Sequence, residues 1–221
     1  MIDSLPKEVQ IKSNYRVRNH GEVLTAKREV EAMLDLVKNE SERIDSSFLE
    51  PACGDGNFLV AILERKLKAV VMRYKTKRAD FEFYLLSALA SIYGIDLLED
   101  NVQIARDRMF KIACDCYKNS LKTKPDEQFQ NIMKFILSKN ILQGDSLNGI
   151  DKIIFTQWGF TNYRLNRVEY AFIDLDKENV APIFRNEIVN DKGEKVYFPK
   201  ELKIYPSVYY RKLLEVAEWA F

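Results

Sequence analysis

The sequence predicts an α/β fold whose sheet is mostly parallel and doubly wound. Short apolar runs alternate with amphipathic segments from residue 26 to about residue 150. Strands that alternate with helices pair in parallel, because each connection returns across the sheet through a helix. A second observation is the glycine bend Gly54-Asp55-Gly56, which separates an apolar run from a helical one. A strand, a tight bend and a helix in this order are typical of ligand sites in α/β proteins.

Each element is predicted from its periodicity and its flanking residues. Val30, Met33, Leu34 and Val37 recur at helical spacing, and Thr25 precedes them as a candidate N-cap. Two acids begin the helix after the second strand and suit its positive end. The expected helices span 26–39, 58–74, 80–91, 99–117 and 128–138, and the expected strands span 46–52, 92–98 and 140–144.

Two regions flank or modify this pattern. Residues 1–25 are polar and are expected to form an N-terminal lead-in, whereas 26–221 are expected to form one domain. The pattern is less regular from about residue 151. There we expect strands at 152–158, 167–175 and 196–198, a turn at 190–195 and a terminal helix at 207–220.

Composition excludes several functional classes. The chain has 221 residues, of which 34 are basic and 33 acidic, so its net charge of +1 lacks the basic signature of a nucleic-acid-coating protein. Three cysteines and one histidine argue against a disulfide framework, a zinc site and histidine-dependent catalysis. No run approaches the roughly 20 apolar residues of a membrane span, and the N-terminus lacks the apolar core of a signal peptide. We therefore expect a cytoplasmic protein without a metal or a membrane partner.

The segment Phe48-Leu49-Glu50-Pro51-Ala52-Cys53-Gly54-Asp55-Gly56-Asn57-Phe58-Leu59 carries the strongest functional signal. A bend of this kind exposes backbone N–H groups at a positive helix end, and its glycines let a ligand approach the main chain. An ordinary tight turn also fits a lone Gly-x-Gly. The dinucleotide fingerprint is excluded by Leu59, and no Gly-Lys-Ser/Thr follows to make a P-loop.

The fuller string resembles the first motif of class I S-adenosylmethionine-dependent methyltransferases. The adenine-specific (N6) DNA methyltransferases of restriction-modification systems have its closest form, Asp/Glu-Pro-Ala-Cys-Gly-x-Gly-x-Phe. The resemblance implies a Rossmann-like class I methyltransferase fold over 26–221 and S-adenosylmethionine as cofactor. It also implies DNA as a partner and assigns to cofactor binding the residues Glu50, Pro51, Ala52, Gly54, Asp55, Gly56, Asn57 and Phe58.

Three further segments resemble the family in the same order and extend the likeness over about residues 15 to 150. Thr25 matches a threonine near the methionine end of the cofactor, although Ala26 stands where the family has proline. Asp96 and Leu97 end the second strand, where an acid can accept hydrogen bonds from the ribose hydroxyls. Asp145 and Ser146 end the third strand, near the cofactor's adenine. Taken singly, Asp96 also fits a helix-capping acid, and Gly144-Asp145-Ser146 a plain turn.

One motif of the family is missing. Adenine methyltransferases have Asn/Asp-Pro-Pro-Tyr/Phe after their fourth strand. Its acceptors bind the adenine amine as positive charge develops, and its aromatic ring stacks on the flipped base. This chain has six prolines, no two of them adjacent, and no Asn-Pro or Asp-Pro after Asp145. We therefore assign no catalytic residue.

Three explanations remain open. The fourth strand lies beyond Phe221, or the chain is an inactive cofactor-binding or DNA-binding subunit that works with a partner, or it uses another acceptor and chemistry. Two further patterns are ambiguous between nucleic-acid contacts and ordinary structure. They are the aromatic and basic residues between Trp158 and Arg211 and the basic run from Arg65 to Arg78.

Overall fold

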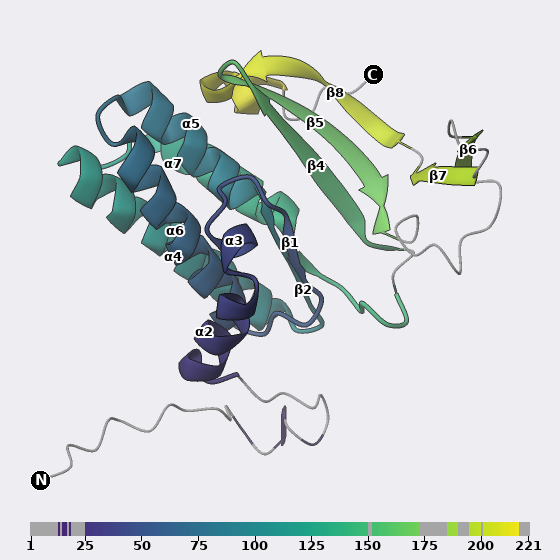
Figure 1. The fold of residues 1–221 in the computed structure, drawn as a ribbon. Coiled ribbons are helices and arrows are strands. Elements are labelled where there is room, and N and C mark those ends of the chain that lie inside the picture. Colours follow the sequence, from purple (N-terminus) through teal and green to yellow (C-terminus); the bar gives the residue numbers. More distant parts are fainter. Residues whose placement is uncertain are drawn as a thin grey trace, which may run out of the picture.

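The fold is taken from a computed structural model, which describes residues 13, 15, 16, 18, 25–149, 152–172, 185–189, 195–199 and 201–216. In the segment from His20 to Thr25, which resembles the stretch before the first helix of the methyltransferases, only Thr25 lies within these residues. The described chain is mixed α/β and contains a parallel and an antiparallel three-stranded sheet, together with a two-stranded hairpin (Figure 1).

The predicted parallel sheet is confirmed for the three strands before residue 150. β1 (Phe48–Glu50), β2 (Ile92–Asp96) and β3 (Ile141–Gln143) pair in the order β1-β2-β3, and every pair is parallel. The carboxyl ends of all three strands therefore meet at one edge of the sheet. The glycine bend follows β1 at this edge, and Asp96 ends β2 there.

Helices connect these strands and lie together on one side of the sheet (Figure 1). Consecutive strands are neighbours, so right-handed crossovers bring all connecting helices to the same face. A doubly wound sheet needs a reversal of strand order, and the described parallel strands contain none. The connecting helices are α4 (Asn57–Tyr74) and α5 (Arg78–Ala90) between β1 and β2, and α6 (Glu99–Leu121) and α7 (Glu127–Asn140) between β2 and β3. Helices α2 (Lys27–Leu36) and α3 (Lys38–Ser41) precede β1.

The N-terminal helix differs from the prediction. We expected one helix over 26–39, but α2 ends at Leu36 and α3 begins at Lys38, because Val37 leaves helical geometry with φ −117° and ψ 37°. The N-cap of α2 is Ala26, whose side chain cannot accept a hydrogen bond. Thr25 is therefore not the cap; its carbonyl instead accepts a hydrogen bond from Asn57 Nδ2 at 3.1 Å.

The strands after residue 150 form a separate antiparallel sheet. β4 (Ile154–Thr161), β5 (Arg164–Ala171) and β8 (Glu201–Tyr209) pair in the order β4-β5-β8, and β6 (Arg185–Val189) pairs with β7 (Lys195–Pro199). The tight turn between β4 and β5 places Asn162 and Tyr163 at φ 51° and 61°. Two successive positive φ angles are typical of a hairpin turn whose twist matches its strands.

The prediction of a terminal helix over 207–220 is only partly confirmed within the described residues, because the segment begins as a strand and continues as a 3-10 helix. Residues up to Tyr209 belong to β8, where Val208 pairs with Leu165, and a 3-10 helix, η4, spans Tyr210–Val216. The apolar spacing of this segment fits both structures, and pairing with β5 decides in favour of the strand. The rest of the predicted helix, 217–221, lies outside the described residues.

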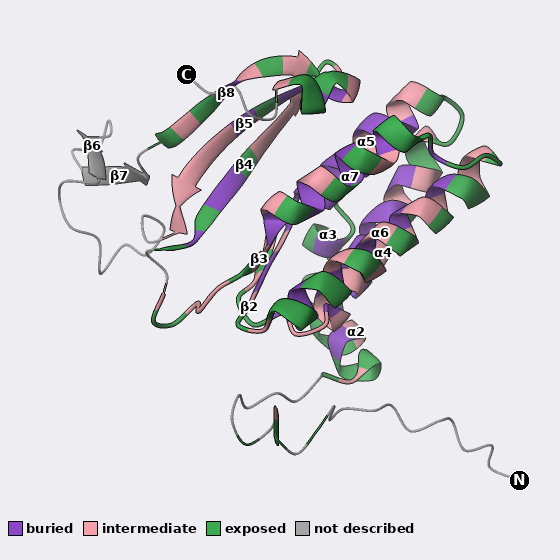
Figure 2. Ribbon diagram, turned by 180° about the vertical axis from the view of Figure 1, so that it is seen from behind, coloured by how far each residue is buried: buried purple, intermediate pink, exposed green. Residues whose placement is uncertain are grey.

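β2 is buried on both faces and separates the two layers. Ile92 packs in the core formed with the helices, and a Cβ on Gly94 would lie 2.7 Å from Leu59 of α4. On the other face, Tyr93 and Ile95 pack with residues of the antiparallel layer. Figure 2 shows buried residues along the helices and in β4. Successive side chains of β2 thus point alternately toward the helices and toward the antiparallel sheet, so the parallel sheet packs between these two layers.

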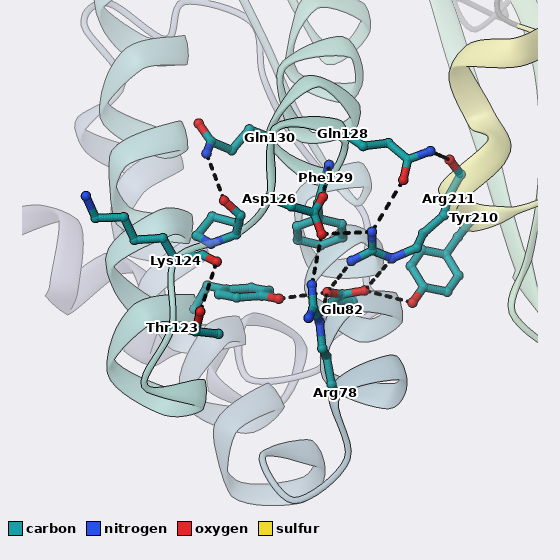
Figure 3. Close-up of polar contacts among 12 residues, drawn as sticks. Arg78, Glu82, Thr123, Lys124, Asp126, Gln128, Phe129, Gln130, Tyr210 and Arg211 are labelled. Carbon is teal, nitrogen blue, oxygen red and sulfur yellow. Dashed lines mark hydrogen bonds and ion pairs between the residues drawn. The ribbon is translucent and has the colours of Figure 1, made fainter.

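A buried carboxylate fastens the C-terminal part to the helices (Figure 3). Glu82 of α5 is 1% exposed and accepts hydrogen bonds from Tyr117 and Tyr210 at 2.7 and 2.8 Å. Its oxygens also bind Arg78 at 2.8 Å and Arg211 at 2.6 Å. Burial raises the pKa of Glu82, but the hydrogen bonds from these partners outweigh burial and the pKa falls below its usual value.

Candidate functional site

The glycine bend has the backbone geometry that only glycine adopts cheaply. Gly54 and Gly56 have φ angles of 54° and 89°, in the left-handed region. Gly56 is the N-cap of α4, and its N–H donates to the Cys53 carbonyl at 2.9 Å. A Cβ on Gly56 would lie 2.9 Å from the Cβ of Ala105, so this glycine also lets α4 approach α6. The first N–H groups of α4 have no acceptor within the helix and favour an anion.

Asp96 joins the end of β2 to this bend. Its Oδ2 accepts a hydrogen bond from the Gly54 N–H at 2.9 Å. Its Oδ1 accepts from Leu98 N at 2.9 Å and from Asn101 Nδ2 at 3.1 Å. A carboxylate has about four acceptor positions, so one position on Oδ2 remains for a ligand. Asp96 thus orients the bend and keeps part of its capacity to accept a hydroxyl.

A small pocket of about 140 Å³ opens beside the bend. It contains seven of the residues that the sequence assigned to the cofactor, namely Thr25, Glu50, Ala52, Gly54, Asp55, Asn57 and Phe58, together with Met33 and Cys53. The other assigned residues, Pro51, Gly56, Asp96, Leu97, Asp145 and Ser146, are not part of its lining. The pocket is smaller than the roughly 300 Å³ of the smallest drug-sized sites, so a nucleoside would extend beyond it along the edge of the sheet.

The turn after β3 reaches the same edge. The Gly144 N–H donates to the Asp96 carbonyl at 3.0 Å, and Ser146 Oγ donates to the Pro51 carbonyl at 2.8 Å. Asp145 Oδ1 accepts the N–H groups of Leu147 and Asn148, both at 2.9 Å, within its own turn. These bonds lower the pKa of Asp145. The carboxylate therefore holds the turn in this structure and contacts neither the bend nor Asp96.

Arg108 of α6 binds the glycine bend and was not predicted from the sequence. Its guanidinium donates to the carbonyl and to Oδ1 of Asp55 at 2.7 and 3.0 Å, and to Asn57 Oδ1 at 2.9 Å. Asn101, which is 1% exposed, likewise orients Asp96. Both residues lie on an amphipathic helix whose periodicity indicates only which face is buried, so no sequence signal marked either of them.

Cys53 lies beside the bend as a neutral thiol. Burial, together with the nearby Asp96 and Glu50 carboxylates, raises the pKa of Cys53 to about 12. A thiol in this state is a poor nucleophile, because the thiolate is the reactive form. All three cysteines are free, and within the described residues no group of His, Cys, Asp and Glu could hold a metal ion.

The basic and aromatic residues that resembled a nucleic-acid surface are largely engaged within the fold. Arg65 binds Glu31 and Asp35 at 2.6 and 2.8 Å. Arg167 is 2% exposed and stacks on the ring of Tyr205. Lys66 is fully buried and donates to the carbonyls of residues 43, 44 and 46. Ordinary structural roles account for these three side chains, whereas Arg73 and Trp158 of the same two patterns line a cavity.

No protein-family profile, curated protein or solved structure matches this chain. Among the helices of the described ranges, none combines the length and the apolar character that crossing a lipid bilayer requires.

Proposed function

We propose that this chain is an S-adenosylmethionine-binding domain of the class I methyltransferase type. The observation that carries the proposal is the 2.9 Å hydrogen bond from Gly54 N–H to Asp96 Oδ2. It joins the glycine bend after β1 to the acid that ends β2, at the carboxyl edge of a parallel sheet. Nucleoside cofactors bind at this edge in α/β proteins.

The residues around the bend suit the charges of the cofactor's methionine end. The carboxylate would lie against the first N–H groups of α4, where anions are stabilised. The ammonium group would face Glu50, which is half-buried in the pocket lining and binds one backbone N–H at 3.2 Å. Gly54 allows the main chain to approach the ligand closely.

The nucleoside would then extend from the pocket along the open edge of the sheet. Asp96 would accept a ribose hydroxyl at its remaining position, and Leu97, which is 51% exposed, offers an apolar surface beside it. The turn at Asp145 and Ser146 lies next along the edge, where adenine would lie. When bound, the cofactor supplies an electrophilic methyl group, and the chain's residues hold and orient it.

The finer fold assignment belongs to the same proposal. Three neighbouring parallel strands joined by crossover helices are compatible with one half of a Rossmann-like fold. The antiparallel layer covers the other face of this half. A class I methyltransferase core that keeps the first three parallel strands and has an antiparallel sheet in place of the remaining strands would account for both sheets.

We propose adenine N6 in DNA as the methyl acceptor, because Glu50 to Phe58 most closely resembles the DNA adenine methyltransferases. The missing Asn/Asp-Pro-Pro-aromatic motif favours a second candidate, an inactive cofactor-binding subunit that works with a partner. Both candidates require the cofactor to bind at the glycine bend, and they differ in whether the isolated chain transfers the methyl group.

Calorimetry with S-adenosylmethionine tests binding, and methyl-labelled cofactor incubated with unmethylated DNA, RNA or protein tests transfer. Transfer to DNA identifies the enzyme, and binding without transfer identifies the subunit. Transfer to RNA or protein alone would reassign the substrate. Absence of cofactor binding by the folded chain would contradict the whole proposal.

A further inference from the structure

A larger cavity lies at the opposite edge of the parallel sheet from the glycine bend. It has a volume of about 650 Å³, within the range of small-molecule sites. Ser47 and Ser91, which precede β1 and β2, belong to its lining, and Gly54 and Asp96 do not. Because parallel strands begin at one edge and end at the other, the cavity lies near the start of β2, where Tyr93 also lines it, and the bend lies near its end.

Aromatic rings from both layers contribute to the cavity. Tyr74 at the end of α4 and Tyr84 of α5 stack with 3.7 Å between their ring centres and an interplanar angle of 8°. Trp158 and Phe160 of β4 add rings from the antiparallel sheet. All four side chains are only partly buried, so they retain surface for a planar ligand. Aromatic rings stack on nucleobases with little base specificity.

Arg73 gives the lining an available positive charge. It is exposed, and it forms no hydrogen bond or ion pair with the rest of the described chain. Asp45, the acid of the lining, binds Arg43 at 3.1 Å, although Arg43 also pairs with Glu40 at 3.5 Å. Arginine suits phosphate, since its planar guanidinium can donate two parallel hydrogen bonds.

Ser87 provides a polar group deeper in the cavity. Its side chain belongs to α5 and is 7% exposed, yet its hydroxyl has no hydrogen-bond partner among the described residues. The hydroxyl keeps some solvent access, so water or a ligand in the cavity can satisfy it. The nearby Ser91 shows the usual arrangement, because its hydroxyl donates to carbonyls of residues 44 and 88.

From these contacts we infer that the cavity is a nucleotide-binding site, distinct from the glycine bend. The base stacks on the aromatic rings, Ser87 bonds to a polar atom of the ligand, and Arg73 binds the phosphate. The nucleotide is either free or one unpaired residue of a single strand. This inference does not depend on S-adenosylmethionine binding.

Calorimetry with thymidine 5′-monophosphate and with a short single-stranded thymidine oligonucleotide tests the site. Thymidine probes are used because S-adenosylmethionine contains adenine, so binding of thymine is not binding of a cofactor fragment. The variant Arg73→Gln should weaken binding about tenfold, since it removes a charged hydrogen bond, and Ser87→Ala about threefold. Lys68→Gln is the matched control, because Lys68 is exposed on the same helix, does not line the cavity and carries the same charge.

The two probes distinguish the sources of the nucleotide. Binding of the monophosphate that Arg73→Gln weakens indicates a free nucleotide, whereas binding of the oligonucleotide alone, with the same sensitivity, indicates a single strand. Asp96→Asn should leave either affinity unchanged. The inference is overturned if the folded wild type binds neither probe, or if Arg73→Gln binds as tightly as Lys68→Gln.

Discussion

Replacing Asp96 with asparagine tests the acid that joins the second strand to the glycine bend. The substitution keeps the shape of the side chain and exchanges one acceptor oxygen for an NH₂ donor. With its oxygen at Oδ1, asparagine still accepts from Leu98 N and Asn101 Nδ2, but its NH₂ group then faces the Gly54 N–H. With the amide turned, the two bonds at Oδ1 are lost instead.

The magnitude follows from the bonds that change. A hydrogen bond to a charged group contributes about 1.5–3 kcal/mol, and partial exposure of Asp96 lets water replace part of it. We therefore expect the free energy of unfolding to fall by about 1 kcal/mol. Losing the bond to a ribose hydroxyl as well should weaken S-adenosylmethionine binding at least tenfold, since about 1.4 kcal/mol corresponds to tenfold.

Calorimetry with S-adenosylmethionine and urea denaturation measure the two effects separately. Asp107→Asn is the control, because Asp107 is an exposed acid of α6 whose partner, Gln103, lies on the same helix. It should change neither quantity appreciably. If Asp96→Asn loses stability but binds the cofactor within twofold of wild type, the acid only supports the bend and does not hold the ribose.

Three further predictions concern the packing around the bend and the buried carboxylate. Gly56→Ala should cost about 2 kcal/mol in urea denaturation, because its φ is 89° and its Cβ would lie 2.9 Å from that of Ala105; an unchanged midpoint would contradict this. Arg108→Met should lower S-adenosylmethionine affinity severalfold and cost less than about 1 kcal/mol in stability, since the Arg108 side chain, which is 36% exposed, positions the bend. Calorimetry showing wild-type affinity would refute that role. Glu82→Gln should cost about 3 kcal/mol at pH 7, because Arg211 loses its buried partner. The pKa of Glu82 is lower in the folded protein than its unfolded value of about 4.5. Its contribution to the free energy of unfolding is therefore present above pH 4.5 and is lost as the pH falls through the folded pKa. If Glu82→Gln has the same pH dependence of stability as the wild type, this reasoning is ruled out.

The parallel half of the fold could be predicted because its signals are local. Helical periodicity, buried strands and the bend at Gly54 can each be recognised from a short stretch of sequence. Helices between consecutive strands then favour parallel pairing. The motif order also predicted that Asp96 would lie beside the bend, and the structure brings the two together through one hydrogen bond. S-adenosylmethionine as the ligand remains a prediction.

The sequence by itself determined the order of the strands and helices before residue 150 and the presence of a bend that needs glycine. Tertiary structure alone decided that β8 forms a strand where helical spacing was equally good, that Arg108 holds the bend, and that Glu82 collects partners from α5, α6 and η4. These features depend on contacts between segments far apart in the chain. Local pattern determines which residues are buried within an element, whereas the pairing of distant elements determines what those residues meet.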